Sequence, residues 1–139
     1  PWRQGSIPPS AFQMRRQQTK RDLGRTWLWR TIDFVALDRP CRVLIQFHEL
    51  KRNCSFTLGT VASDGFLRIV CVREFHISEP GWHCHAVLRC EDGVTSFAHH
   101  GVRKRPQQPI LGAVFGVEQR TATAMAAKFF CLDVRGELL

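Results

Sequence analysis

Three histidines follow Glu74 within eleven positions in the middle of the chain: His76, His83 and His85. His83 and His85 are separated by one residue, Cys84. Because side chains in a β-strand alternate between its two faces, an extended segment here places both imidazoles on the same side, with Cβ atoms about 7 Å apart. Two imidazoles at this spacing can hold one divalent metal ion. Glu74 can supply a carboxylate to that ion, and His76 is the alternative third ligand.

The types of these side chains indicate which ion to expect. A carboxylate combined with two imidazoles favours Mg²⁺ or Mn²⁺ over the ions that thiolate sites select. Such an ion polarises a phosphoryl oxygen and neutralises the charge that grows during displacement at phosphorus. The alternative is that His83 and His85 are surface imidazoles on the wet face of a sheet. Cys84 is not expected to be a nucleophile activated by its neighbours, because in a strand it faces away from both histidines and toward the core.

The segments that must position these residues are predicted to be β-strands from Pro40 onward. Stretches rich in β-branched and aromatic residues alternate with turn signals such as Asp-Gly and Pro-Gly. We therefore expect an α+β fold with an antiparallel sheet of four to five strands and flanking helices. Pairing of the last two strands would bring Glu74 beside the histidines. The expected strands cover residues 41–48, 55–61, 66–75 and 82–90.

Helices are predicted both before and after these strands along the chain. Ser10 as an N-cap and Gly24 as a stop predict a basic, exposed helix over residues 11–23. The segment 27–37 has mixed apolar spacing that fits either a helix or a strand, and we favour the helix. The Ala-rich segment 121–132 predicts a third helix.

The domain organisation follows from the same pattern. Residues 1–9 are expected to be a flexible arm and residues 10–139 a single α+β domain. Residues 101–109, which combine Gly, Pro and basic residues, are expected to be a loop. The chain has 139 residues, of which 44% are hydrophobic and 23% charged, which excludes a largely disordered protein. No apolar run approaches about 18 residues, so neither a transmembrane helix nor a membrane partner is expected.

The six cysteines contain no C-x-x-C pair, which argues against a zinc ribbon or finger. They can be interpreted as three disulfides or as buried reduced thiols. We favour reduced thiols, because a core of this size needs no covalent staples. This interpretation predicts a cytoplasmic location, or a nuclear one if the protein is eukaryotic or viral.

The chain carries 20 Lys and Arg against 12 Asp and Glu, a net charge of +8, which predicts an anionic partner. A positive field of this kind attracts phosphate polymers without reading their sequence. The alternative is that the basic residues form ordinary solvated faces. Trp82 is a further candidate, as a ring on which bases stack. The basic candidates form three clusters: Arg15, Arg16, Lys20 and Arg21; Lys51 and Arg52; and Arg103, Lys104 and Arg105.

Residues 81–88 (GWHCHAVL) resemble the His-hydrophobic-His strand of the HUH endonucleases, which include rolling-circle replication initiators, relaxases and transposases. Residues 70–74 are similar to the strand that delivers the family's acidic or third metal ligand, and residues 41–47 to its first motif strand. The resemblance covers about residues 41–135. It implies a ferredoxin-like antiparallel sheet and single-stranded or hairpin DNA as the partner. It also implies Mg²⁺ or Mn²⁺ held by His83, His85 and Glu74 or His76.

The same resemblance implies a nucleophilic tyrosine on a following helix, which would attack DNA and keep the 5′ phosphate covalently. The chain has no tyrosine. The stretch from Lys128 to Cys131 resembles the family's Tyr-Cys stretch, with Phe130 in the tyrosine position and Lys128 as a possible phosphate contact. A phenyl ring has no oxygen that can attack phosphorus. For Phe129 and Phe130 the alternative is ordinary core packing.

The expected function is therefore an HUH-type, metal-dependent domain that nicks and joins single-stranded DNA, inactive as given because Phe130 replaces the tyrosine. Two alternatives stay open. One is a non-catalytic basic α+β module that binds RNA or single-stranded DNA. The other is a protein-interaction domain of a larger polypeptide.

Overall fold

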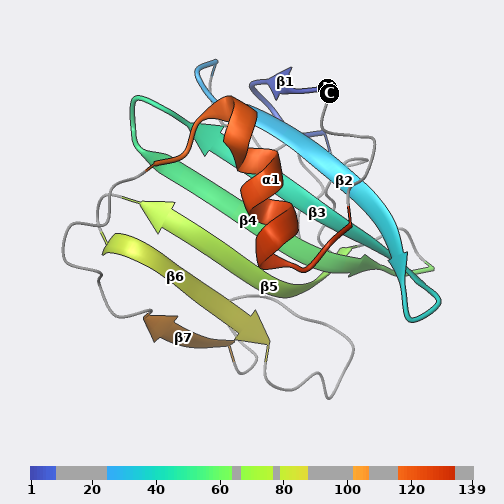
Figure 1. Cartoon of the computed structure of the whole chain (residues 1–139). Helices are drawn as coiled ribbons and strands as arrows, with labels where there is room; N and C mark the ends of the chain where they lie inside the picture. The colour runs from blue at the N-terminus through green and yellow to red at the C-terminus, as the bar shows by residue number, and fades with distance from the viewer. Residues whose placement is uncertain (9–24, 64–66, 77–78, 88–101, 107–115, 134–139) are drawn as a thin grey trace.

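The computed structural model describes residues 1–8, 25–63, 67–76, 79–87, 102–106 and 116–133. These residues form one seven-stranded antiparallel sheet and one helix (Figure 1). The strands follow one another across the sheet in sequence order, so each pairs with its neighbours in the chain. The elements are β1 (Arg3–Gln4), β2 (Leu28–Ala36), β3 (Arg39–His48), β4 (Asn53–Val61), β5 (Leu67–His76), β6 (Glu79–Val87), β7 (Val102–Pro106) and α1 (Gln119–Phe129).

The sheet has two faces, and strand alternation sorts the side chains between them. In β3, Val43, Ile45 and Phe47 join the core cluster that includes residues of α1, whereas Leu44 joins a second cluster on the other side. All four side chains are buried. We call the side that packs against α1 the helix face and the other side the reverse face. A central strand that is buried on both faces explains why β3 reads as a continuous apolar run.

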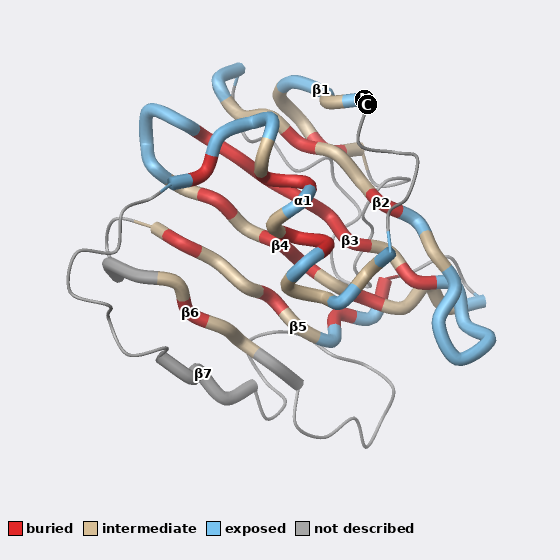
Figure 2. The backbone as a smooth tube through the Cα atoms, in the orientation of Figure 1, coloured by how far each residue is buried: buried red, intermediate tan, exposed pale blue. Residues whose placement is uncertain are grey.

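The helix α1 begins with a capping box and lies over the central strands. Glu118 and Thr121 satisfy each other's backbone N–H groups at its N-terminus. Ala122 and Ala126 are fully buried, and such small side chains allow the helix to approach the sheet closely. Figure 2 shows the buried stretches of the strands beneath α1. This packing fixes which side of the sheet each strand residue faces.

The N-terminal residues belong to the fold, which corrects the expectation of a flexible arm over residues 1–9. β1 pairs with β2, with Arg3 opposite Trp29. Ile7 is only 2% exposed and packs on the reverse face with Trp29 and Leu44. Burial of Ile7 and the strand pairing together hold residues 1–8 against the sheet.

Two segments predicted as other structures are strands. Residues 27–37, for which the helix was favoured, contain β2, and the strand interpretation holds. The pattern was ambiguous because both faces of β2 are apolar: Ile32 packs on the helix face and Trp29 on the reverse face. The expected basic loop over 101–109 contains β7. Charged residues and proline suit a strand at the end of a sheet, because they discourage pairing with another chain.

Most of the other predicted strands and helices are confirmed, but the number of strands is not. The strands expected at 41–48, 55–61, 66–75 and 82–90 are confirmed as β3 to β6 within the described residues, which leave out 66 and 88–90, and the helix expected at 121–132 is confirmed as α1. The helix expected at 11–23 lies outside the described residues. The α+β class holds, but the sheet has more strands than the four to five expected. Its sequential order also differs from a ferredoxin-like fold, in which helices connect strands within the sheet. Within the described residues, no helix is both long and apolar enough to span a bilayer.

Candidate metal centre

The register of β5 and β6 brings the predicted ligands together. Glu74 is paired with His83, and Val72 with His85. His83 and His85 therefore lie on the same face as Glu74, as the one-residue spacing predicts. His76 follows Glu74 by two residues and also reaches the carboxylate. We call Glu74, His76, His83 and His85 the histidine cluster.

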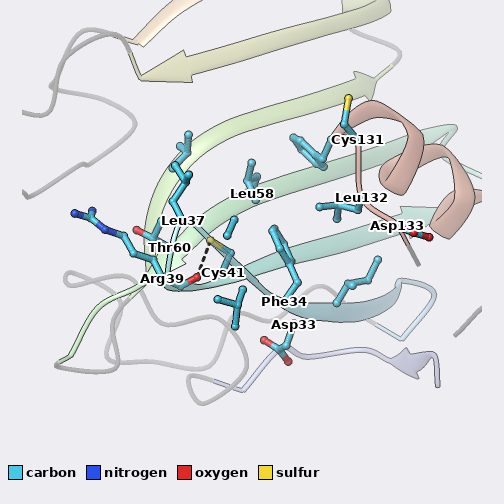
Figure 3. Close-up of a pocket in the computed structure, with 16 residues that line it drawn as sticks. Asp33, Phe34, Leu37, Arg39, Cys41, Leu58, Thr60, Cys131, Leu132 and Asp133 are labelled. Atoms are coloured by element: carbon cyan, nitrogen blue, oxygen red, sulfur yellow. Dashed lines mark hydrogen bonds between the residues drawn. The ribbon is translucent and has the colours of Figure 1, made fainter. Parts of the chain in front are cut away.

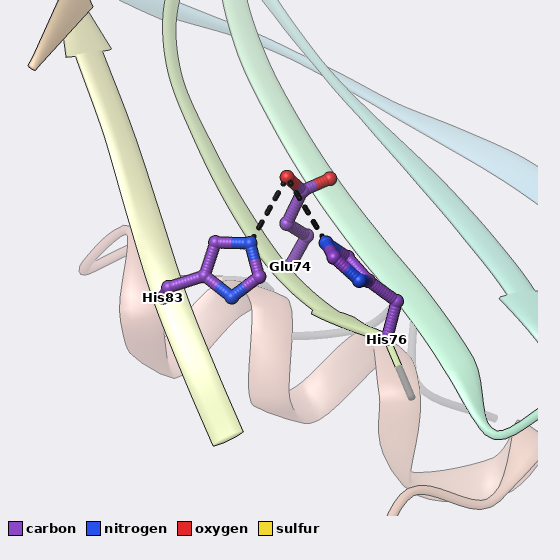
Figure 4. Close-up of side chains that lie close together, drawn as sticks. All are labelled: Glu74, His76 and His83. Atoms are coloured by element: carbon purple, nitrogen blue, oxygen red, sulfur yellow. Dashed lines mark hydrogen bonds and ion pairs between the residues drawn. The ribbon is translucent and has the colours of Figure 1, made fainter. Parts of the chain in front are cut away.

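All three imidazoles of the histidine cluster point at one carboxylate oxygen. The Oε1 atom of Glu74 is 2.9 Å from Nε2 of His85, 3.2 Å from Nε2 of His83 and 3.8 Å from Nε2 of His76. The rings of His76 and His83 meet edge to face, with centroids 4.8 Å apart. Figure 4 shows Glu74 between His83 and His76. One carboxylate oxygen thus lies close to the Nε2 atoms of three imidazoles from two adjacent strands.

The cluster lies at the boundary between the interior and solvent. The His83 side chain is 5% exposed, whereas those of Glu74, His76 and His85 retain between 20% and 27% exposure. His83 is held by the interior, whereas the three partly exposed side chains can be approached from solvent.

The spacing of these atoms suits a metal ion. Protein nitrogen and oxygen ligands lie about 2.0–2.2 Å from Zn²⁺, which places neighbouring ligand atoms of a tetrahedron about 3.3–3.6 Å apart. The three distances from Glu74 Oε1, which are 2.9, 3.2 and 3.8 Å, differ from this range by 0.1 to 0.4 Å, so small side-chain shifts would bring these atoms to the spacing of metal ligands. The ligand atoms of Glu74, His76 and His83 all lie within 4.8 Å of one another. Without the ion, protonated Nε2 atoms can donate to the carboxylate, so metal binding would replace N–H protons at the same positions.

The residues that alternate with the cluster lie on the helix face. Trp82 packs in the core with Phe56 and Phe75, at ring-centroid distances of 5.4 Å and 5.8 Å. The guanidinium of Arg73 lies 5.2 Å from the centre of the Trp82 ring and 4.3 Å from that of Phe129. These contacts partly bury the Trp82 ring against protein groups, and its role as a stacking platform for bases stays a prediction.

Cys84 also lies on the helix face, as the strand pattern predicts. Its Sγ atom is 3.1 Å from Sγ of Cys71 on β5. Burial is the largest cause and the hydrogen bond with Cys84 the next largest, and they raise the pKa of the Cys71 thiol to about 12. The five described cysteines are free thiols. The close approach of Cys71 and Cys84 was not expected from the sequence, because it depends on the register between two strands.

The structure does not bring Phe130 to the histidine cluster. Phe130 is the C-cap of α1 and packs against the core on the helix face, where it contacts Phe129 at a ring-centroid distance of 4.9 Å. The cluster occupies the reverse face, so the sheet separates the two. Lys128, also carried over from the HUH resemblance, is exposed on α1. The core-packing alternative for Phe130 is the one that the geometry favours.

Phe130 instead lines a pocket of about 980 Å³ on the helix face, which the sequence did not predict (Figure 3). Its walls come from the β2–β3 hairpin, from β4 and from the residues just after α1. Phe34, Leu58 and Leu132 give it an apolar lining, with Cys41 and Cys131 as the thiols. Leu37 at the tip of the hairpin is 95% exposed, but its exposure and the pocket beside it could not be predicted from the sequence.

The basic candidates are distributed over several places. Arg103, Lys104 and Arg105 are in β7, where Lys104 is the register partner of His85 and Arg105 that of Cys84. Lys51 and Arg52 are exposed in the turn between β3 and β4, as expected. The remaining candidates, Arg15, Arg16, Lys20 and Arg21, lie outside the described residues. One basic cluster therefore lies on the strand next to the candidate metal ligands.

Comparisons of the chain with protein-family models, with curated proteins and with solved structures find no match.

Proposed function

We propose that this protein is a divalent-metal-dependent domain that binds single-stranded or hairpin nucleic acid and hydrolyses its phosphodiester bonds. The observation that carries the proposal is the convergence of three imidazole Nε2 atoms on Glu74 Oε1 at the surface of the sheet. The histidine cluster is the site of the ion, and its half-exposed side chains leave room for a phosphate oxygen.

The donor set narrows the choice of ion. Imidazole nitrogens suit first-row transition metals, whereas Mg²⁺ prefers oxygen ligands and water. Three histidines and one glutamate therefore favour Mn²⁺ or Zn²⁺ over Mg²⁺. Such an ion would polarise a phosphoryl oxygen and neutralise charge in the displacement.

The surroundings of the cluster favour a nucleic acid as the substrate. The adjacent strand β7 has the sequence VRKRP, and its Lys104 is paired with His85. The chain as a whole has a net charge of +8. Positive charge beside a metal site attracts the phosphate backbone and holds it through contacts that do not depend on sequence.

The proposal contains no covalent protein–DNA step. A phenyl ring cannot attack phosphorus, and Phe130 packs on the face away from the cluster. Water is therefore the attacking group that we propose, which makes the reaction a hydrolysis. The products are one strand end with a hydroxyl and one with a phosphate.

A paired measurement of binding and cleavage tests the proposal. Labelled single-stranded DNA, hairpin DNA and RNA would be titrated with protein in Mn²⁺, Zn²⁺, Mg²⁺ or EDTA, and each mixture would then be run on a denaturing gel. We expect cleavage in Mn²⁺ or Zn²⁺ that is lost in EDTA and in Glu74→Gln. The matched control, Glu49→Gln, changes the same side chain in an exposed turn and should keep full activity.

A binding-only module is the second candidate, and the basic strand β7 favours it. In that case binding would be unchanged by EDTA and by Glu74→Gln, and no strand would be cut. The triple variant Arg103→Ala, Lys104→Ala, Arg105→Ala would then weaken binding and lower its salt dependence, by about 2 in the slope of log K against log salt for a single strand. The control, Lys51→Ala with Arg52→Ala, removes charge at a turn far from β7 in the strand order.

A further inference from the structure

Cys71 and Cys84 form a close thiol pair on the helix face, behind the strands that carry the histidine cluster. Cys84 is paired in register with Arg73, two residues from Cys71, so the cysteines are diagonal neighbours across β5 and β6. Their Sγ atoms are 3.1 Å apart. Diagonal neighbours in an antiparallel sheet ordinarily lie farther apart than directly paired residues, so this approach reflects two side chains turned toward each other.

The pair differs from the other described cysteines. Cys41 and Cys54 are buried, and Cys131 is exposed, whereas Cys71 and Cys84 are half-buried. Their sulfur atoms are only about 1 Å farther apart than the atoms of a disulfide bond. We propose that Cys71 and Cys84 are a redox-reactive dithiol that closes to a cross-strand disulfide by exchange with an anionic small-molecule disulfide of the glutathione type.

The proposed reaction is two successive exchanges. The Cys84 thiolate is the attacking group, because burial and the contact with Cys84 raise the pKa of the Cys71 thiol. It attacks a sulfur of the small disulfide, forms a mixed disulfide and releases one small thiolate. The second protein thiol loses its proton to solvent, attacks the protein sulfur of the mixed disulfide and releases the second small thiolate. Both released thiolates take up protons. The protein dithiol is oxidised to a disulfide, and the small disulfide is reduced to two thiols.

Arg73 gives the site its preference for an anionic reagent. It lies in register with Cys84, and its guanidinium is held by stacking on Phe129 and Trp82. A fixed cation beside the sulfurs attracts the carboxylates of a glutathione-type disulfide. A neutral disulfide of similar size would lack this attraction.

The test uses the full chain in EDTA, so that its result does not depend on the proposed metal site. Reduced protein would be equilibrated with glutathione disulfide, alkylated and analysed by intact mass and non-reducing peptide mapping. We expect an intact mass about 2 Da below that of the reduced protein before alkylation and two fewer alkyl groups after it, with the peptides of Cys71 and Cys84 linked. Oxidation should be slower with hydroxyethyl disulfide, which is neutral, or in Arg73→Gln.

Matched variants make the outcome decisive. Cys131→Ser removes an exposed thiol outside the pair and should still form the link. Neither Cys84→Ser nor Cys71→Ser should form it, and Cys71→Ser should accumulate the mixed disulfide at Cys84. A linkage between other cysteines, or wild-type protein that gains only mixed disulfides, would overturn the proposal. Failure here would leave the metal-dependent function untouched, because that function is measured on the reduced protein.

Discussion

Glu74 faces His83 across the β5–β6 ladder, and its Oε1 atom lies 3.2 Å from His83 Nε2. The pairing is direct, so the two backbones fix this contact without help from a loop. His85 and His76 then reach the same oxygen from two residues farther along their strands. A site built on two paired strands is rigid, and rigid ligand placement favours metal binding because little order has to be gained when the ion enters.

Metal ions should stabilise the folded protein. A ligand that binds only the folded state at a free concentration 100 times its Kd adds about 2.7 kcal/mol to the free energy of unfolding. We expect the thermal midpoint to rise with Zn²⁺ or Mn²⁺ in wild type and in Glu49→Gln. The rise should disappear in Glu74→Gln and His85→Ala. An equal rise in all four proteins would place the bound ion elsewhere.

Restoring a tyrosine at the position that resembles the HUH nucleophile should not create covalent chemistry. Phe130→Tyr adds a hydroxyl on the helix face, next to the pocket, whereas the histidine cluster lies on the reverse face. We expect no protein–DNA adduct on a denaturing gel with hairpin DNA and Mn²⁺. Unchanged thermal melting of the variant would show that it is folded. An adduct mapped to position 130 would contradict the arrangement of the two faces.

Acid should destabilise the fold through His48. Its Nδ1 accepts the backbone N–H of Lys51 at 3.2 Å, and its Nε2 lies 2.8 Å from Thr26 Oγ1. Burial is the larger cause and the positive charge of Lys51 the smaller one, and together they lower the pKa of His48 below its usual 6.5. The unfolded chain then binds a proton before the folded chain does. The contribution of His48 is therefore complete above about pH 6.5 and is lost below it, by at most about 1.4 kcal/mol per pH unit.

Urea unfolding between pH 7.5 and 5.5 measures this effect. His48→Asn keeps an acceptor near the Lys51 N–H but cannot titrate, so its stability should fall less steeply with acid than that of wild type. The difference between the two slopes isolates His48 from the other histidines, which both proteins share. Identical slopes would show that His48 takes up its proton equally in both states.

Gly59 should tolerate no side chain. A Cβ atom at this position would lie 2.7 Å from the backbone oxygen of Arg68 and 2.7 Å from Cγ of Leu67. The carbonyl belongs to the neighbouring strand, at the bulge between β4 and β5, and cannot move without breaking the ladder. We expect Gly59→Ala to lower the free energy of unfolding by about 1–3 kcal/mol. Thr60→Ala, the next residue in β4, is the control and should change it much less.

The sequence predicts the middle of the fold better than its ends. In β3 to β6 the β-branched and aromatic runs are long, and turn residues separate them clearly. In β2 the pattern fails because Leu28, Trp29 and Ile32 are all packed, although on different faces. The sequence pattern does not predict β7, because its charged residues and Pro106 are as typical of a loop as of an edge strand.

The sequence likewise predicts one part of the candidate site and not another. The spacing of His83 and His85 fixes their common face, and the hairpin explains their meeting with Glu74. The sequence spacing does not fix whether the histidine cluster lies on the same side of the sheet as α1. That depends on which apolar face of the sheet the helix covers. Phe75 and Trp82, which alternate with Glu74 and His83, provide that apolar face. The sequence shows this alternation, but a resemblance carried by short motifs placed the helix on the opposite side.

From Cys71 to His76 in β5 and from Trp82 to His85 in β6, the imidazoles therefore lie on one side of the sheet and the sulfurs on the other. Inserting or deleting one residue within either strand would exchange the two sets, driving histidines into the packed interior and thiols toward water. The two strands are joined through residues 77–78 alone, so a change of length there would also shift their register. Residues 71–76 and 82–85 must therefore keep their spacing for both sets of side chains to stay on their own faces.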